Sequence, residues 1–146
     1  MARRGNTPKR KIKGDAVYNS TLVQKFINKI IRGGKKSKAE KIFYMAVLRA
    51  GEQVKKTPLE VFEKAMQNVT PMLEVKARRV GGATYQVPIE VTRERGQAIA
   101  MQWIRQAAEA RKAKSMIEGL SGELIDAYNG VGIAMKSRES LHKTAD

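Results

Sequence analysis

The feature that most constrains the fold is the glycine pair Gly81-Gly82, which separates two stretches of alternating apolar and polar residues. The alternating apolar residues are Leu73, Val75 and Ala77 before the pair, and Tyr85, Val87, Ile89 and Val91 after it. This period of two, interrupted by two glycines, predicts a β-hairpin at about residues 72–91. Because a solitary hairpin is only marginally stable in water, the rest of the chain must provide a body that supports it.

Three helices are predicted before the hairpin. Residues 20–33 carry apolar side chains every three or four positions and end at a second glycine pair. Ser37–Glu40 has the spacing of a capping box, which predicts a helix over about residues 38–50. Thr57–Glu60 repeats that spacing with proline at the first helical position, and we expect this helix to end before Pro71.

Three more helices are predicted after the hairpin. Thr92 can cap a long helix that reaches about Lys112, and Ser115–Glu118 forms a third capping box. The helix that follows this box should end at Asn129, and a short final helix is expected from about Ile133. The sequence therefore predicts a mainly α protein, a single domain of about six helices with one protruding two-stranded hairpin between the third and fourth.

The charge of the chain points to a polyanionic partner. The 146 residues include 29 Lys and Arg against 14 Asp and Glu, a net charge of +15. Of these, 16 basic and three acidic residues lie in residues 1–56. Solubility alone calls for a net charge of only about 2 to 8 on a small domain, so this excess favours nucleic-acid binding. Residues 1–13 hold six basic residues and no acidic one, which predicts a flexible basic arm ahead of a helical domain at 14–146.

Enzyme, metal and membrane functions find little support in the sequence. There is no cysteine, and the one histidine, His142, lies close to the C-terminal end, so no metal or nucleophile constellation is predicted. Gly81-Gly82 lacks the lysine and the following helix of a phosphate-binding loop. No apolar run approaches the roughly 20 residues that span a bilayer. We expect a cytoplasmic protein that is not an enzyme, with no cofactor, small-molecule substrate or membrane partner.

Two groups of basic residues are candidates for phosphate contacts. Lys76, Arg78 and Arg79 lie on both faces of one predicted strand, which suits insertion between phosphate-lined walls, although charges on a strand can also simply guard its edge. The second group is Lys25, Lys29, Arg32, Lys35, Lys36 and Lys38. Tyr85 can pack across the hairpin or stack on an unpaired base. Trp103 is expected in the core rather than as a base platform.

Charge and element order leave the kind of nucleic acid open. Helices with a protruding basic ribbon also describe DNA-bending proteins, in which an apolar residue at the ribbon tip opens a base step. Here Val80 is the candidate for such a wedge, within the tip sequence Val80–Ala83. A structural RNA-binding protein and a DNA-bending protein are therefore both compatible with these residues.

Three stretches resemble one known family. They are GGKKSKAEKI at 33–42, TPLEVFEKAMQNVTPMLEVKARRVGGATYQVPIEV at 57–91 and KSM at 114–116. They are similar to the family of the seventh-numbered protein of the bacterial-type small ribosomal subunit. The resemblance implies a six-helix domain with a hairpin, a structural constituent that binds 16S-type rRNA on its 3′ major domain and nucleates assembly of the subunit head. It also implies neighbouring small-subunit proteins as partners, and a hairpin near exit-site tRNA and mRNA.

The resemblance also implies particular contact residues. Its rRNA-facing surface comprises Lys9, Arg10, Lys11, Lys35, Lys36, Lys76, Arg78, Arg79, Arg93, Arg95 and Lys114. Gly81, Gly82 and Tyr85 are expected to face the exit-site tRNA and mRNA. The chain ends at Asp146, whereas family members usually continue into an aromatic, basic tail, so the contacts of that tail are not expected from these residues. The ribosome concerned is that of a bacterium or of an organelle with bacterial-type ribosomes.

Overall fold

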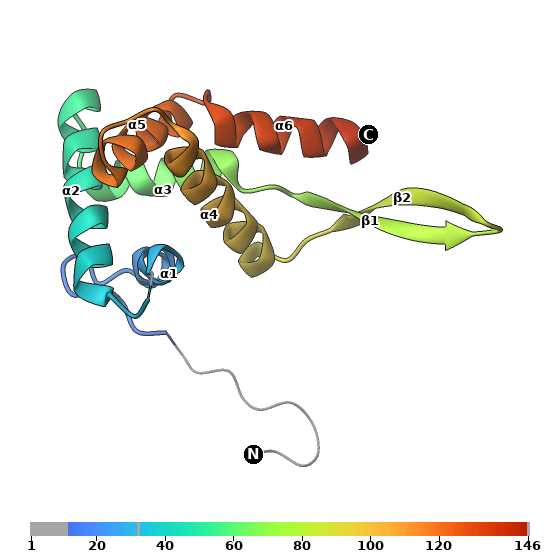
Figure 1. Ribbon diagram of the computed structural model, residues 1–146, viewed down its shortest axis with the longest axis horizontal. Helices are drawn as coiled ribbons and strands as arrows, with labels where there is room; N and C mark the ends of the chain where they lie inside the picture. The colour runs from blue at the N-terminus through green and yellow to red at the C-terminus, as the bar shows by residue number, and fades with distance from the viewer. Residues whose placement is uncertain (1–11, 32, 146) are drawn as a thin grey trace, which may run out of the picture.

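The computed structural model describes residues 12–31 and 33–145, and within them the chain forms six helices and one hairpin. In chain order these are α1 (Thr21–Ile30), α2 (Lys36–Val54), α3 (Pro58–Val69), β1 (Leu73–Val80), β2 (Ala83–Glu90), α4 (Arg93–Ala110), α5 (Met116–Tyr128) and α6 (Ile133–Ala145). The helices pack together, and the hairpin extends away from them (Figure 1). This arrangement confirms the predicted fold. Most of the expected basic arm lies outside the described residues.

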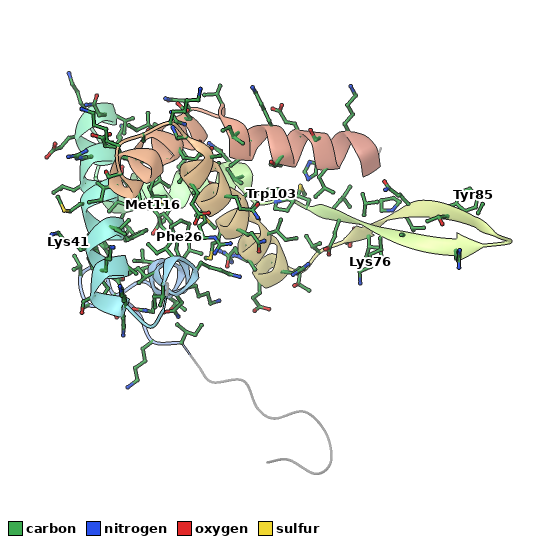
Figure 2. The ribbon with its side chains drawn as sticks, viewed as in Figure 1. Phe26, Lys41, Lys76, Tyr85, Trp103 and Met116 are labelled. Atoms are coloured by element: carbon green, nitrogen blue, oxygen red, sulfur yellow. The ribbon has the colours of Figure 1, made fainter. Side chains whose placement is uncertain are left out.

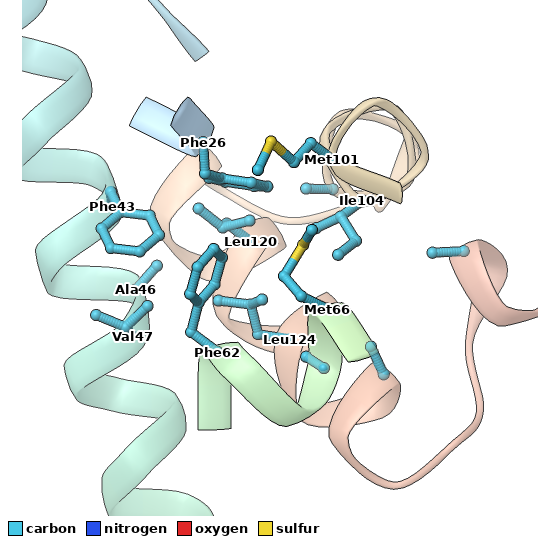
Figure 3. Close-up of a cluster of buried hydrophobic side chains, with 14 of the residues drawn as sticks. Phe26, Phe43, Ala46, Val47, Phe62, Met66, Met101, Ile104, Leu120 and Leu124 are labelled. Atoms are coloured by element: carbon cyan, nitrogen blue, oxygen red, sulfur yellow. The ribbon is translucent and has the colours of Figure 1, made fainter. Parts of the chain in front are cut away.

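The core of the helical body is built around three phenylalanines from three different helices. Phe26, Phe43 and Phe62 are fully buried, and the ring of Phe62 meets the other two edge-on, with centroids 5.4 and 5.1 Å away. Edge-to-face pairs at this spacing add stabilisation beyond the area that they bury. Helix α5 contacts α2, α3 and α4, and its residues Leu120 and Leu124 complete the cluster (Figure 3). The apolar stripes of the sequence thus converge on one core.

Helix caps agree with the sequence at three of the four helix starts for which they were predicted. The side chains of Thr57, Thr92 and Ser115 each accept a hydrogen bond from the backbone N–H three residues later. The prediction for Ser37 is wrong, because α2 begins at Lys36 and no side chain caps it. Gly33 and Gly34, with positive φ angles of 59° and 74°, form the turn before the helix, and Lys35 is its last non-helical residue, so Ser37 already lies inside the first turn.

The register of the hairpin places both apolar and polar side chains on each of its faces. Gly81 and Gly82 have φ angles of 57° and 83°, as a two-residue type I′ turn requires, and Val80 pairs with Ala83 beside it. Residues directly opposite each other point to the same face, and Leu73 is opposite Glu90 while Glu74 is opposite Ile89. Each apolar row of one strand therefore shares its face with a polar row of the other, and neither face of the ribbon is apolar throughout.

Contacts at its base hold the ribbon to the helices. Arg95 in α4 donates to Glu74 in β1 at 3.0 Å, and the backbone N–H of Met72 donates to Nε2 of His142 in α6 at 3.2 Å. At Gly96 a Cβ would lie only 2.8 Å from the Pro71 carbonyl oxygen, so the absence of a side chain lets α4 approach the chain before β1. Helix α6 lies alongside the hairpin base (Figure 1). The ribbon is thus anchored at one end.

Candidate nucleic-acid interface

Basic side chains occupy both faces of the ribbon. Lys76 is opposite Val87 and Arg79 is opposite Thr84, so the odd spacing between them places the two cations on opposite faces, and both are exposed. Arg78 is opposite Tyr85 in the register, but its side chain lies outside the part that the structure describes. Figure 2 shows Tyr85 on the outer part of the ribbon and Lys76 closer to the helices. The two-faced charge predicted from the sequence is confirmed for Lys76 and Arg79.

The tip of the ribbon is narrow and open. Nothing lies within 4 Å of the position of a Cβ on Gly81 or Gly82, and the side chain of Tyr85 is 57% exposed. Tyr85 is therefore not buried against the helices, and its ring is accessible to a partner that approaches the outer part of the ribbon. The two glycines allow the backbone of such a partner to come close.

Two arginines at the start of α4 differ in how much of their positive charge is available to a phosphate. Arg93 is exposed, whereas Arg95 pairs with Glu74 across the base of the ribbon. The hydrogen bond from Arg95 is the main reason that the pKa of Glu74 lies below its ordinary value. Arg95 therefore links α4 to the base of the ribbon, and the charge that it presents to a phosphate is partly offset by its own partner.

The start of α2 and the loop between α4 and α5 come together although some 80 residues separate them. Lys35 and Lys38 on one side, and Ala113 and Ser115 on the other, line a common hollow of about 720 Å³. Lys114 lies between the last two residues and is exposed, as is Lys36. The structure thus brings Lys35 and Lys38 to one hollow, and the exposed Lys36 and Lys114 are sequence neighbours of residues that line it.

The α2 start adds a further attraction for anions. No side chain caps this helix, and the N–H of Lys36 donates to the carbonyl of Gly34, so the attraction for anions comes from the positive dipole end of the helix and the lysines around it. Nζ of Lys36 also lies 4.0 Å from Oε1 of Glu40, one turn later. Both side chains are exposed, so the ammonium of Lys36 remains largely solvated. Lys9, Arg10, Lys11 and Arg32 lie outside the described residues.

A buried carboxylate that sequence reasoning missed anchors the segment before α1. The carboxylate of Asp15 accepts from the N–H groups of Val17, Tyr18 and Ser20, and from the hydroxyl of Tyr44 at 2.9 Å. Burial alone would raise the pKa of Asp15, but these four donors together hold it below 3.8. Burial and the hydrogen bond to Asp15 raise the pKa of Tyr44 to about 12. The chain thereby enters α1 from a fixed position against α2.

A second missed cluster joins α4, α5 and α6. Nη1 of Arg111 donates to Glu123 at 2.9 Å and to Asp126 at 2.8 Å, and the buried Glu123 also accepts from the N–H of Ala134. Hydrogen bonds to both acids, of which that to Asp126 is the larger influence, outweigh burial and raise the pKa of Arg111. A signal was present in the sequence, because Glu123 interrupts the apolar stripe of α5 between Leu120 and Ala127.

The remaining candidates play structural parts. Trp103 is half-buried against the core, as expected, and His142 accepts a hydrogen bond at the ribbon base. Within residues 12–31 and 33–145 no group of three or more acidic, histidine or cysteine side chains could hold a metal ion. No helix in this described part is long and apolar enough to cross a membrane. The features of the surface that can act on a partner are its cations, its open ribbon and the hollow.

Comparison with known proteins identifies the family. The model of the family described as "Ribosomal protein S7p/S5e" matches residues 2–146. A small ribosomal subunit protein uS7 of Chloroflexus aurantiacus is 52% identical over all of this chain and 93% of its own length. Proteins of the same description from Natranaerobius thermophilus and Clostridium novyi are 53% and 55% identical, again over the whole chain and 94% of each relative.

These matches extend along the whole length of the chain and are far above the level at which a shared fold alone would be inferred. They also agree with the resemblance seen in the sequence and with the expectation that the chain is not an enzyme, since the family consists of structural components of the ribosome. The chain belongs to the ribosomal protein S7p/S5e family and is a structural constituent of the small ribosomal subunit.

Proposed function

We propose that this protein binds the small-subunit rRNA directly, docks on its 3′ major domain and nucleates assembly of the subunit head, where it contacts neighbouring ribosomal proteins. The ribbon lies near the exit-site tRNA and the mRNA path, with Gly81, Gly82 and Tyr85 towards them. The observation that carries this proposal is the ribbon itself, which extends from the helices with exposed cations on opposite faces (Figure 1).

A ribbon with this distribution of charge suits a cleft better than a flat surface. Lys76 and Arg79 can each neutralise a phosphate on a different wall, which a one-sided strand could not do. Neither face is apolar throughout, so packing the ribbon against the helices would bury polar side chains together with apolar ones and would be disfavoured. Folded RNA offers phosphate-lined clefts between its helical segments, and recognition there depends mainly on shape and backbone charge.

The helical body supplies a second contact region. Lys35 and Lys36 at the start of α2 are exposed, and α2 lies at the far side of the body from the ribbon tip (Figure 1). Lys114 is exposed in the loop that shares the hollow with Lys35 and Lys38. Arg93 lies between these regions at the start of α4, and Lys9, Arg10 and Lys11 of the arm add charge to the same molecule. Two separated regions would fix both the position and the orientation of the protein on RNA.

The decisive experiment measures equilibrium binding to a transcript of the small-subunit rRNA 3′ major domain, beside duplex DNA of equal phosphate count, from low to physiological salt. We expect a preference for the rRNA that persists at physiological salt. Equal binding that disappears for both ligands as salt rises would mean that the charge acts only generically and would contradict the proposal. A preference for bent DNA would favour a DNA-bending role instead.

Paired substitutions test the ribbon. Lys76→Ala with Arg79→Ala should weaken rRNA binding and reduce the magnitude of the slope of log affinity against log salt by about 1.4 to 1.8, because each removed phosphate contact contributes about 0.7 to 0.9. The matched control is Lys56→Ala with Lys64→Ala, which removes the same charge from exposed positions outside the ribbon; because Lys64 lies over the ring of Tyr128, circular dichroism checks that this variant is folded. If both pairs lower the slope equally, the ribbon has no special role.

A further inference from the structure

The hollow beside the start of α2 has a composition that the proposed phosphate contacts do not explain. Its volume is about 720 Å³, within the range of about 300 to 1,000 Å³ that is typical of small-molecule sites. Apolar residues from four segments line its interior, namely Ile30, Ala39, Ile42, Ala108 and Met116. A surface that bound only phosphates would need the lysines at the rim but no apolar interior.

The charged residues of the hollow are distributed unevenly. Lys35 and Lys38 lie on the α2 side, whereas Glu109 lies on the α4 side. Arg111 also lines the hollow, but its charge is offset by Glu123 and Asp126, with which it is paired. An anionic group is therefore favoured at the α2 side, beside Lys35 and Lys38.

One chemical unit combines a flat, mainly apolar body with anionic groups at one edge, and that unit is a nucleotide within an RNA strand. We propose that the hollow takes the base of a single unpaired nucleotide, with the base against Met116 and Ile42 and the adjoining phosphates beside Lys35 and Lys38. The inference deepens the proposed rRNA binding and depends on it, because it assigns a base-binding site to a surface otherwise credited only with phosphate contacts.

The test fills the hollow without changing its charge. Ala113 lies in the exposed loop at the rim, so Ala113→Trp should occupy the hollow while leaving the core intact. The matched control is Ala110→Trp, at an exposed position of α4 that does not line the hollow. We expect Ala113→Trp to weaken binding to the 3′ major domain transcript about tenfold, the scale of one lost base contact, with an unchanged salt slope. Ala110→Trp should bind like the wild type.

Chemical probing gives a second, direct readout. Dimethyl sulfate methylates accessible adenine and cytosine base edges, and a cleft-bound base is shielded from it. We expect a nucleotide, unpaired in the free transcript, that is protected in complexes with the wild type and with Ala110→Trp but reactive in the complex with Ala113→Trp. Lys38→Ala should instead lower the salt slope by about 0.7 to 0.9, and Lys41→Ala, one turn further on and outside the hollow, should change it less.

The outcomes separate this inference from the proposed function. If the wild type shows no preference for the transcript, the proposed function fails. If the wild type binds with that preference and the two tryptophan variants have equal affinities and equal protection patterns, the base-binding site alone is wrong. A normal affinity of Ala113→Trp for RNA, together with poorer incorporation into subunits, would also overturn it and would assign the hollow to a neighbouring protein.

Discussion

The helical body and the ribbon use apolar residues in opposite ways. In the body, apolar side chains from α1, α2, α3, α4 and α5 face one interior, where the rings of Phe26, Phe43 and Phe62 meet. In the ribbon, the apolar rows of the two strands lie on opposite faces, and most side chains remain exposed. The body therefore holds its shape through its own packing, whereas the ribbon is held at its base and has no interior.

This difference indicates where each part obtains its stability. Burial of apolar area stabilises the body in isolation. The ribbon gains little from burial, so its ordering beyond Glu74 and Met72 depends on the hairpin hydrogen bonds and on any partner that it meets. Substitutions in the two regions should consequently affect different measurements.

The largest expected effect comes from the centre of the body. Phe62→Ala should lower the free energy of unfolding by about 3 to 5 kcal/mol, because it removes a fully buried ring and leaves a cavity between two others. Denaturant titration followed by circular dichroism measures this loss. Tyr85→Ala on the ribbon is the control and should unfold like the wild type. Equal losses of unfolding free energy in the two variants would contradict the proposed difference between body and ribbon.

The buried ion cluster should come next. Arg111→Ala leaves the carboxylate of Glu123, which is fully buried, without its cationic partner. We expect a loss of about 2 to 4 kcal/mol, somewhat less than for a wholly buried pair because Arg111 is partly exposed. Arg49→Ala removes an exposed arginine 3.9 Å from Glu118 and should cost much less. A thermal unfolding series that ranks the two variants equally would contradict this account.

The anchor before α1 should show a dependence on pH. Asp15→Asn should cost about 1 to 3 kcal/mol at neutral pH, because the ionised carboxylate accepts four hydrogen bonds. The pKa of Asp15 is lower in the folded protein than its ordinary value of 3.8, so its contribution is complete above about pH 4 and is lost as the pH falls through the folded pKa. The difference between wild type and variant in urea titrations should shrink on acidification. A constant difference from pH 7 to pH 2 would rule out this role.

The smallest effect on unfolding, and the sharpest test of the comparison, concerns the ribbon base. Arg95→Ala breaks an exposed ion pair with Glu74 and should leave the global unfolding transition unchanged. It should nevertheless speed amide hydrogen exchange in β1 near Glu74, because the ribbon loses one of its attachments. Arg93→Ala, an exposed arginine two residues away, serves as the control. Unchanged exchange in both variants would mean that Arg95 does not orient the ribbon.

The sequence predicted best what depends on local periodicity. The hairpin, its glycine turn and the inward faces of the helices follow from spacings of two, three or four residues, and these agree with the structure. The Tyr44 contact of Asp15 and the cluster around Arg111 were missed because these partners are 29 and up to 15 residues away, where no local pattern links them. The other three donors to Asp15 are backbone N–H groups within five residues, which any side chains there would supply. The capping box predicted at Ser37 is wrong because the helix begins one residue before it, directly after the turn formed by Gly33, Gly34 and Lys35. The roles of the site residues in RNA binding stay predictions.

The position of Trp103 has a practical consequence for spectroscopy. It is the only tryptophan of the chain, and it is half-buried on α4 against the core, so its fluorescence reports on the helical body. The chain has no cysteine, so a single Thr84→Cys substitution would place one thiol-reactive dye at the exposed outer end of the ribbon. Folding of the body and engagement of the ribbon can then be followed in the same sample at two separate wavelengths.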